Sequence, residues 1–301
     1  MKLQILGCHA ATPRYLTHPS SQVLQAGRHL MLIDCGEGTQ MQLRRYRVRF
    51  SRIDHIFISH LHGDHFFGLP GLISTFRLLG RETPLHIYGP KGIKDAITLL
   101  LKLGDSWTSY PLHFHELTAD TPQTLFEDGE LTVTTLPLDH RIYTNGFLFE
   151  LSEGQYKLHL EEVRKYGIDR AYYRKIKLGK DVPDPSGRII PNKLLTLPPP
   201  PAKKYAYCSD TAFMSALAPL IQGVDTLYHE ATFLESHAAL AAKTGHSTAR
   251  EAAQMALQAE VGQLILGHFS TRYKELERFR EEAHRVFPRV ELAADGKVFE
   301  W

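Results

Sequence analysis

Short apolar runs that end in polar residues recur along this chain and predict a mixed α/β fold. The clearest run is residues 56–58 (Ile-Phe-Ile), which leads into His60-Leu61-His62-Gly63-Asp64-His65. β-Branched and aromatic residues in such a run are typical of a buried strand. Similar runs predict strands at 2–6, 29–33, 85–88, 131–136, 146–151, 204–207, 226–228 and 264–266, with 7–28 as a loop. Spaced apolar positions predict helices at 40–46, 69–79, 93–103 and 273–287, the last amphipathic.

Five of these predicted strands are followed by side chains that bind metals or transfer protons. In layered α/β proteins the carboxyl ends of strands are where sites form. Imidazole nitrogen and carboxylate oxygen are ligands that zinc accepts. A single such residue is more often structural, and a histidine-rich loop can be solvated surface, but the repetition favours a metal site. The residues are His60, His62, Asp64, His65, His140, Asp210, Glu230 and His268.

Spacing within the first of these loops suggests how ions would be shared. His60 and His62 are two apart, so on an extended loop they point the same way and can bind one ion. Asp64 and His65 leave the loop differently and can serve a second ion.

Length, cysteine content and the apolar pattern restrict the class of protein. With 301 residues and 43% apolar composition, the chain can bury a core as one large domain or as a domain with an insertion. Its three cysteines, Cys8, Cys35 and Cys208, form no close pair, which fits a reducing compartment and argues against a disulfide scaffold or a thiolate zinc site. The start has no signal-peptide pattern and the chain has no long apolar span, so we expect a cytoplasmic protein without a membrane partner.

Positive charge is concentrated in one segment. Residues 155–193 hold ten Lys and Arg against five Asp and Glu, a net charge of +5 in a chain whose total is +2. A basic insert on a mildly acidic body indicates a polyanionic partner, and its four interleaved tyrosines suit stacking on RNA. The alternative is an ordinary solvated excursion. The proline run 198–201 would be a stiff return to the core.

Two further features of the sequence, Asp34 and an arginine run, each allow two interpretations. Asp34, at the end of the strand 29–33, either caps a turn or supports the metal site from behind. The arginine run between residues 44 and 52 is either solvated surface or a surface that faces a phosphate chain. Ser247 and Thr248 are expected to begin a helix as N-cap residues.

The motifs together resemble the metallo-β-lactamase superfamily and, within it, the ribonuclease Z family. The resemblance to the superfamily rests on His60 to His65 with the later His140, Asp210 and His268. The narrower resemblance rests on 34–40 (DCGEGTQ), 66–72 (FFGLPGL), 209–211 (SDT), 229–232 (HEAT), 246–248 (HST) and 270–273 (STRY). The chain departs from the family's Pro-x-Lys-x-Arg-Asn pattern at residues 13–19. It also lacks the Gly-Pro motif of the family's inserted arm, and has residues 167–171 (GIDRA) there.

The resemblance implies a fold, a reaction and a set of partners. We expect residues 1–301 to form one αββα sandwich, with 155–195 as an inserted flexible arm that binds tRNA. The implied activity is zinc-dependent removal of the 3′ trailer from precursor tRNA, leaving a 3′-hydroxyl on the tRNA and a 5′-phosphate on the trailer. A homodimer is also implied.

The resemblance also assigns roles to individual residues. One zinc ion would be held by His60, His62 and His140, and a second by Asp64, His65 and His268, with Asp210 between them. Asp64 would orient or deprotonate the nucleophile, and the pair Glu230 and His246 would protonate the leaving oxygen. In the arm, the cations expected to contact RNA are Arg170, Arg174, Lys175 and Lys177.

Two rival functions remain at this stage. A small-molecule hydrolase of the same superfamily would need no basic, tyrosine-rich insert. A catalytically idle RNA-binding protein on the same scaffold would be expected to have lost ligands, whereas the set here is complete.

Overall fold

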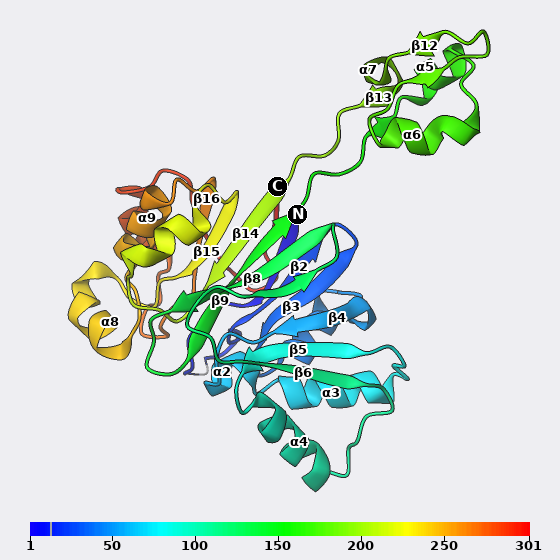
Figure 1. Cartoon of the computed structure of the whole chain (residues 1–301). Coiled ribbons are helices and arrows are strands. Elements are labelled where there is room, and N and C mark those ends of the chain that lie inside the picture. The colour runs from blue at the N-terminus through cyan, green and yellow to red at the C-terminus, as the bar shows by residue number, and fades with distance from the viewer. Residues whose placement is uncertain (13) are drawn as a thin grey trace. The chain divides into compact units, whose positions relative to one another are not determined.

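The chain forms two compact units in a computed structural model, which describes residues 1–12 and 14–301. The first unit combines Met1–Glu150 with Lys204–Trp301, and the second is Leu151–Lys203 (Figure 1). The predicted arm, 155–195, lies inside the second unit. Pro13, in the segment that departs from the family pattern, lies outside the described residues.

Two seven-stranded mixed sheets make up the first unit, as the αββα prediction required. The first has the order β18-β1-β2-β3-β4-β5-β6 and the second β17-β16-β15-β14-β9-β8-β7. The first sheet comprises β1 (Lys2–Gly7), β2 (Ser21–Ala26), β3 (His29–Cys35), β4 (Ile53–Phe57), β5 (Leu85–Pro90), β6 (Leu112–Leu117) and β18 (Val298–Glu300). The second comprises β7 (Thr124–Glu127), β8 (Leu131–Leu138), β9 (Thr144–Leu151), β14 (Lys203–Cys208), β15 (Thr226–Glu230), β16 (Gln263–Gly267) and β17 (Val290–Leu292).

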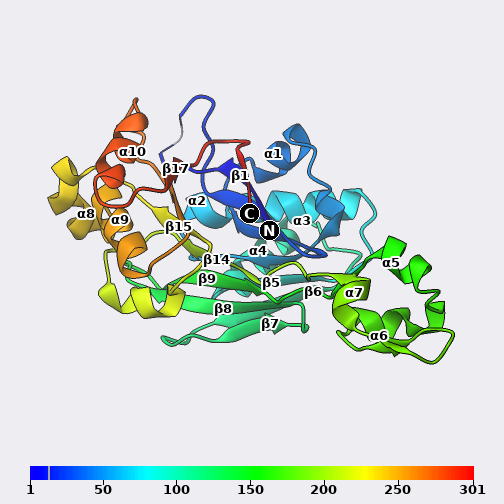
Figure 2. The same ribbon diagram turned by 90° about the horizontal axis from the view of Figure 1, so that it is seen from above.

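Helices cover the outer faces of both sheets. In Figures 1 and 2, α3 and α4 lie beside β5 and β6, and α9 lies beside β15 and β16. The helices are α1 (Thr39–Arg45), α2 (Gly63–Phe66), α3 (Leu69–Leu78), α4 (Ile93–Leu103), α8 (Ala238–Thr244), α9 (Ala249–Gln258) and α10 (Glu277–His284), and the 3-10 turns are η1 (Phe50–Arg52), η3 (Ser215–Ile221) and η4 (Glu235–His237). Thr248 caps α9 in a capping box with Glu251, so the predicted helix start is confirmed.

Two sequence predictions were wrong. The segment predicted as a loop between the first two strands contains β2, which is paired on both sides. Its polar residues gave no strand signal, although the side-chain oxygen of buried Gln22 accepts a hydrogen bond from the Tyr205 hydroxyl at 2.6 Å. The helix predicted over 273–287 is shorter, because Tyr273 lies in a turn where its hydroxyl accepts a hydrogen bond from the Leu234 backbone N–H.

The parallel strands of both sheets bring their carboxyl ends to one edge of each sheet. β3, β4, β5 and β6 run parallel, as do β14, β15, β16 and β17. Aromatic side chains fill the space between the sheets, where Phe57 lies 5.4 Å from Phe147 between ring centroids. The sandwich therefore holds rigidly the loops that follow its strands.

The second unit, Leu151–Lys203, has a small apolar core of its own. Its elements are β10 (Lys157–Leu158), α5 (Leu160–Lys165), η2 (Arg170–Tyr172), α6 (Tyr173–Lys177), β11 (Val182–Pro183), β12 (Ile189–Ile190), α7 (Asn192–Leu195) and β13 (Thr196–Leu197). Six buried side chains form the core: Val163, Ile168, Ile176, Val182, Ile190 and Leu195. Tyr166, Tyr172 and Tyr173 pack against this core, so three of the four tyrosines noted in the sequence fill it at least in part. Within residues 1–12 and 14–301, no helix combines the length and the apolar character needed to cross a membrane.

Candidate metal centre

Residues from four strand ends converge on one site in the first unit. The loop after β4 supplies His60 to His65, and the turns after β8, β14 and β16 supply His140, Asp210 and His268. Two sets of potential ligand atoms lie together: His60, His62, His140 and Asp210 form one, and Asp64, His65 and His268 form the other. All seven side chains singled out as metal ligands are thus brought together, and the same grouping follows from the resemblance.

Asp210 lies between the two sets, with one carboxylate oxygen toward each. Its Oδ2 is 3.5 Å from His60 Nε2 and 3.9 Å from His140 Nε2. Its Oδ1 is 3.4 Å from His65 Nε2 and 3.2 Å from His268 Nε2. This is the arrangement that a carboxylate shared by two cations requires.

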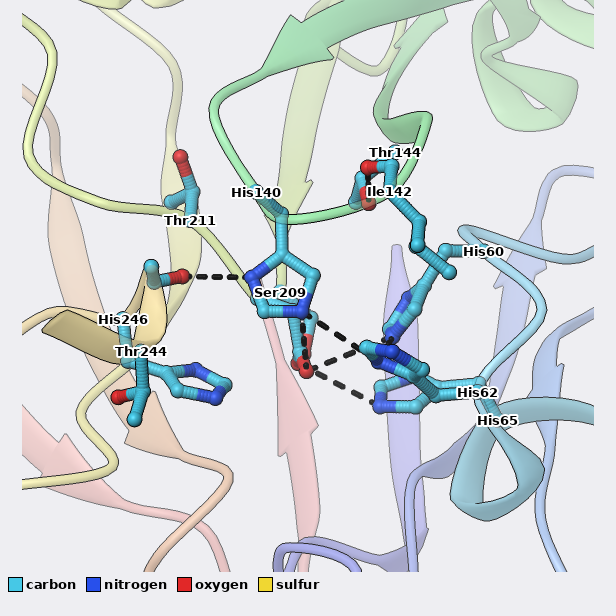
Figure 3. A network of polar contacts seen from close by, with 12 residues as sticks. His60, His62, His65, His140, Ile142, Thr144, Ser209, Thr211, Thr244 and His246 are labelled. Carbon is cyan, nitrogen blue, oxygen red and sulfur yellow. Dashed lines mark hydrogen bonds and ion pairs between the residues drawn. The ribbon is translucent and has the colours of Figure 1, made fainter.

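Four of the histidines are fixed from behind through Nδ1, which leaves Nε2 facing the site. Figure 3 shows this for His140. His65 Nδ1 is 2.7 Å from Asp34 Oδ2, and His140 Nδ1 is 2.7 Å from the Gly245 carbonyl oxygen. Since these oxygens only accept, each Nδ1 must carry the proton. Gly245 has a positive φ of 68°, and a Cβ there would stand 3.0 Å from His140 Nδ1, so glycine permits this close approach.

Hydroxyl groups hold the other two histidines in the same way. Ser59 Oγ donates to Asp34 Oδ2 at 2.9 Å and lies 3.0 Å from His60 Nδ1. Thr232 Oγ1 donates to Glu230 Oε2 at 2.6 Å and lies 2.8 Å from His268 Nδ1. Because each hydroxyl donates its single hydrogen bond to a carboxylate, its oxygen must accept from the imidazole N–H.

Sequence reasoning assigned no role to Ser59, Thr232 or Gly245. For Ser59 the available signal was its position directly before the first histidine. For the other two the signal was weaker, because their partners come from distant parts of the chain. For Asp34, whose role was left open, the hydrogen bond to His65 supports the interpretation as a residue behind the site.

Backbone strain is concentrated around the same site. Asp34 lies near the end of β3, and Asp210 and His268 lie within two residues after β14 and β16; each of the three has a positive φ between 54° and 57°. Non-glycine residues adopt this region at a cost, and such residues cluster at functional sites. The strained turns direct these three side chains toward the cluster.

The donor set fits divalent metal ions. His65 Nε2 is buried without a hydrogen-bond partner among the described residues, yet it faces two carboxylates. Burial lowers the pKa of His60, His62 and His140, which favours the neutral imidazole that a metal needs. Imidazole nitrogen and carboxylate oxygen are a set that zinc and its neighbours accept.

A buried acid–base pair adjoins the cluster. His246 Nδ1 lies 2.7 Å from Glu230 Oε1, and the His246 ring lies 4.9 Å from that of His140 between centroids. Burial disfavours the imidazolium, but the charge of Glu230 and the hydrogen bond outweigh it and raise the pKa of His246 to about 9. The Glu230 carboxylate also accepts from the Thr211 and Thr232 backbone N–H groups, so it is saturated by protein donors and is less suited than Asp210 to bind a metal.

Comparison with known proteins assigns the family. Ribonuclease Z of Bacteroides thetaiotaomicron is 47% identical over 295 residues, covering 98% of this chain and 93% of that protein. Ribonuclease Z of Porphyromonas gingivalis is 47% identical over 98% of this chain and 97% of its own length. The chain belongs to the ribonuclease Z family.

Solved structures agree with this assignment. Human tRNase Z, short form, superposes with a TM-score of 0.72 at 29% identity, covering 100% of this chain and 99% of that one. The metallo-β-lactamase fold protein YhfI of Bacillus subtilis, at 20% identity and a TM-score of 0.69 over 99% of this chain and 98% of its own, shares the fold. A family model described as Anti-Pycsar protein Apyc1 matches residues 1–150. As a ribonuclease Z, the chain is a metal-dependent endoribonuclease of the metallo-β-lactamase superfamily.

The four arm cations predicted to contact RNA lie on consecutive turns of the second unit. Arg170 begins η2, and the other three lie on α6. All four are exposed, while Ile176 between them is buried in the arm's core. Lys175 Nζ lies 5.5 Å from the centroid of the Tyr172 ring, so this tyrosine contacts both the arm's core and a cation.

Proposed function

We propose that this ribonuclease Z removes the 3′ trailer from precursor tRNA, leaving a 3′-hydroxyl on the tRNA and a 5′-phosphate on the trailer. The observation that carries the proposal is the position of Asp210 between two sets of ligands, with the Glu230–His246 pair beside them. One group of side chains can thus hold a pair of cations at a phosphodiester, and the other can supply a proton to it.

The cations proposed here are two zinc ions. His60, His62 and His140 would hold one, Asp64, His65 and His268 would hold the other, and Asp210 would contact both. When bound, such a pair lowers the pKa of water and stabilises charge on the oxygens around phosphorus. Asp64, whose Oδ2 lies 3.4 Å from both His65 Nε2 and His268 Nε2, is the carboxylate proposed to orient the attacking water.

His246 is the proposed general acid. Its Nδ1 is held by Glu230, so Nε2 is the atom from which a proton can pass to the departing ribose 3′ oxygen. Glu230 stabilises the imidazolium and fixes the ring. Water attacks phosphorus, the bond to the 3′ oxygen breaks, and the phosphate stays on the trailer.

Recognition of the tRNA is assigned to the second unit. The name of the human structural neighbour, tRNase Z, supports tRNA as the substrate. The exposed cations Arg170, Arg174, Lys175 and Lys177 would contact RNA phosphates, and a homodimer is proposed as the working assembly.

The test is cleavage of a precursor tRNA transcript by purified, zinc-loaded protein, with product ends mapped on a sequencing gel. The expected products are a tRNA that a ligase requiring a free 3′-hydroxyl accepts and a trailer that a 5′-phosphate-dependent exonuclease degrades. A transcript without trailer and protein stripped of metal are the controls. Absence of cleavage, or a cyclic phosphate on the tRNA, would overturn the proposal.

A further inference from the structure

A hollow of about 410 Å³ on the first unit is lined by cations and has no carboxylate in its lining. It lies where the outer faces of β18, β1 and β2 meet the segment that joins α1 to β4. We call it the cationic hollow. It is lined by Lys2, Gln4, Val23, Gln25, Leu30, Tyr46, Arg47, Val48, Arg49, Arg52 and Val298.

The cations of the cationic hollow have no ion-pair partner within the described chain. Lys2, Arg47, Arg49 and Arg52 form no ion pair among residues 1–12 and 14–301, although other surface cations of this unit, such as Arg28, do. Within the same residues, Arg44 and Arg45 at the end of the adjoining helix α1 also form none. Cations gathered without ion-pair partners repel one another, so a polyanion that binds there relieves that repulsion.

Arg47 occupies a backbone position that glycine would fill at lower cost. It has a φ of 55° directly after the C-cap of α1. The Val48 N–H donates to the Leu43 carbonyl and the Arg47 N–H to the Arg44 carbonyl, which is the Schellman pattern in which glycine is preferred. The strained turn holds the start of the Arg47 side chain at the hollow, which argues against an incidental surface charge.

The remaining lining suits a phosphodiester backbone better than a base. Gln4 and Gln25 add amide donors to the four cations. Val23, Leu30 and Val298 are its aliphatic lining residues, and Tyr46 is the single aromatic residue among the lining residues. Single-stranded bases are commonly held by stacking on aromatic rings, whereas phosphates need only donors and charge.

We propose that the cationic hollow binds phosphates of the RNA backbone, as a docking site on the catalytic unit additional to the arm. The inference rests on the proposed function for RNA as the source of the phosphates. It takes up the second of the two interpretations that the sequence left open for the arginine run, a surface that faces a phosphate chain.

The test uses the full, zinc-loaded chain and a triple variant, Arg47→Gly, Arg49→Gln, Arg52→Gln. The matched control, Lys91→Gln, Lys94→Gln, Lys102→Gln, removes the same charge from exposed positions at and before α4. Binding is measured at several salt concentrations with a precursor tRNA and with an RNA hairpin that lacks the tRNA fold. For the triple variant we expect affinity for both RNAs to fall about tenfold or more, and the salt slope to fall by about one for each phosphate that the variant no longer binds. The control variant should change much less.

Folding and binding are separated by the single variant Arg47→Gly. Because glycine relieves the positive φ, its midpoint of thermal unfolding should stay the same or rise while RNA affinity falls. Metal content and hydrolysis of bis(p-nitrophenyl) phosphate should be unchanged in all variants. The inference would be overturned if the triple variant bound RNA with the same affinity and the same salt slope as the wild type. The inference would also be overturned if inorganic phosphate stabilised the wild type but not the triple variant while RNA binding stayed the same. The hollow would then be a site for free phosphate. Loss of hairpin binding in the variant, with no cleavage of precursor tRNA by the wild type, would sink the proposed function alone.

Discussion

Asp34 accepts a hydrogen bond from His65 at 2.7 Å, and both side chains are fully buried. The same carboxylate accepts from Ser59 and from the Tyr207 hydroxyl, so it joins β3, the loop after β4, and β14. Asp34 is not itself a proposed metal ligand. Its hydrogen bond nevertheless sets the tautomer and the orientation of His65, which is one.

Replacing Asp34 by Asn tests that relationship. The amide would present N–H groups to side chains that already donate, so His65 would lose its fixed orientation. We expect affinity for zinc to fall about 10- to 100-fold with the fold retained. Competition with a chelator measures it, and the exposed Asp120→Asn is the control. Unchanged zinc affinity in Asp34→Asn would contradict the role.

Asp210→Ala should remove more metal than His62→Ala. Asp210 faces both ligand sets, whereas His62 belongs to the first set, where it lies against His60 and His140. Loss of one of about four ligands weakens one ion, but loss of a shared carboxylate weakens both. His140→Ala should behave like His62→Ala, and hydrolysis should fall with metal content. Emission spectroscopy on the dialysed proteins measures the content. Two tightly bound metals in Asp210→Ala would show that the carboxylate is not shared.

His246→Ala should slow cleavage of RNA more than hydrolysis of an activated aryl phosphodiester. A leaving group of low pKa needs little protonation, so loss of a general acid costs about 10²- to 10⁴-fold only on RNA. Glu230→Ala is the less clean variant, because the carboxylate also accepts from Thr211 and Thr232. Rates on both substrates with the same metal-loaded preparation make the comparison. Equal losses on both substrates would point to a structural role.

His55→Phe should flatten the pH dependence of stability on the acid side. Burial and then the neighbouring His86 lower the pKa of His55 to about 4. Between this value and about 6.5, the pKa in the unfolded chain, His55 binds a proton in the unfolded state but not in the folded state. This contribution to stability is complete above pH ~6.5 and is lost as the pH falls toward about 4. The other groups that act on it are His29, His115 and Asp128, the last of which favours the charged form.

Thermal unfolding of wild type and His55→Phe across that range gives the measurement. The Phe ring can keep the contact with Phe126, whose centroid lies 4.7 Å away. Acid release of metal affects both proteins equally, so the difference between them isolates His55. Parallel curves would show that His55 titrates normally in the folded state.

Replacing the arm by a short Gly/Ser linker between Glu150 and Lys204 should leave the chemistry intact. None of the proposed ligands lies in Leu151–Lys203, and this unit has its own core. We expect retained metal and retained hydrolysis of a small phosphodiester. For precursor tRNA, KM should rise about tenfold or more, and binding should depend less steeply on salt. Unchanged tRNA affinity and salt slope in the folded variant would rule out the arm as a binding site and favour a small substrate.

The sequence by itself indicated nine of the fourteen strands in the two large sheets and the set of potential ligands. An apolar run such as 56–58 and the polar residues after it are local features, and the rule that strand ends form sites applies before any contact is known. The helix over 93–103 and the Thr248 cap were equally local. Where local signals were weak, as in β2 with its two glutamines, the element was missed because pairing on both sides decided it.

Only the tertiary structure decided which side chains contact one another at the site and at the cationic hollow. That Asp210 turns one oxygen to His60 and the other to His268 depends on strands from two sheets meeting at one edge. That Arg47 and Lys2 line the same hollow depends on β1 lying beside the end of α1. Such contacts join residues far apart in the chain, and hydrogen-bond direction, tautomer and unpaired charge are properties of neighbours in space. The sequence pattern does not show which distant residues become neighbours, so these properties are defined only in the folded protein.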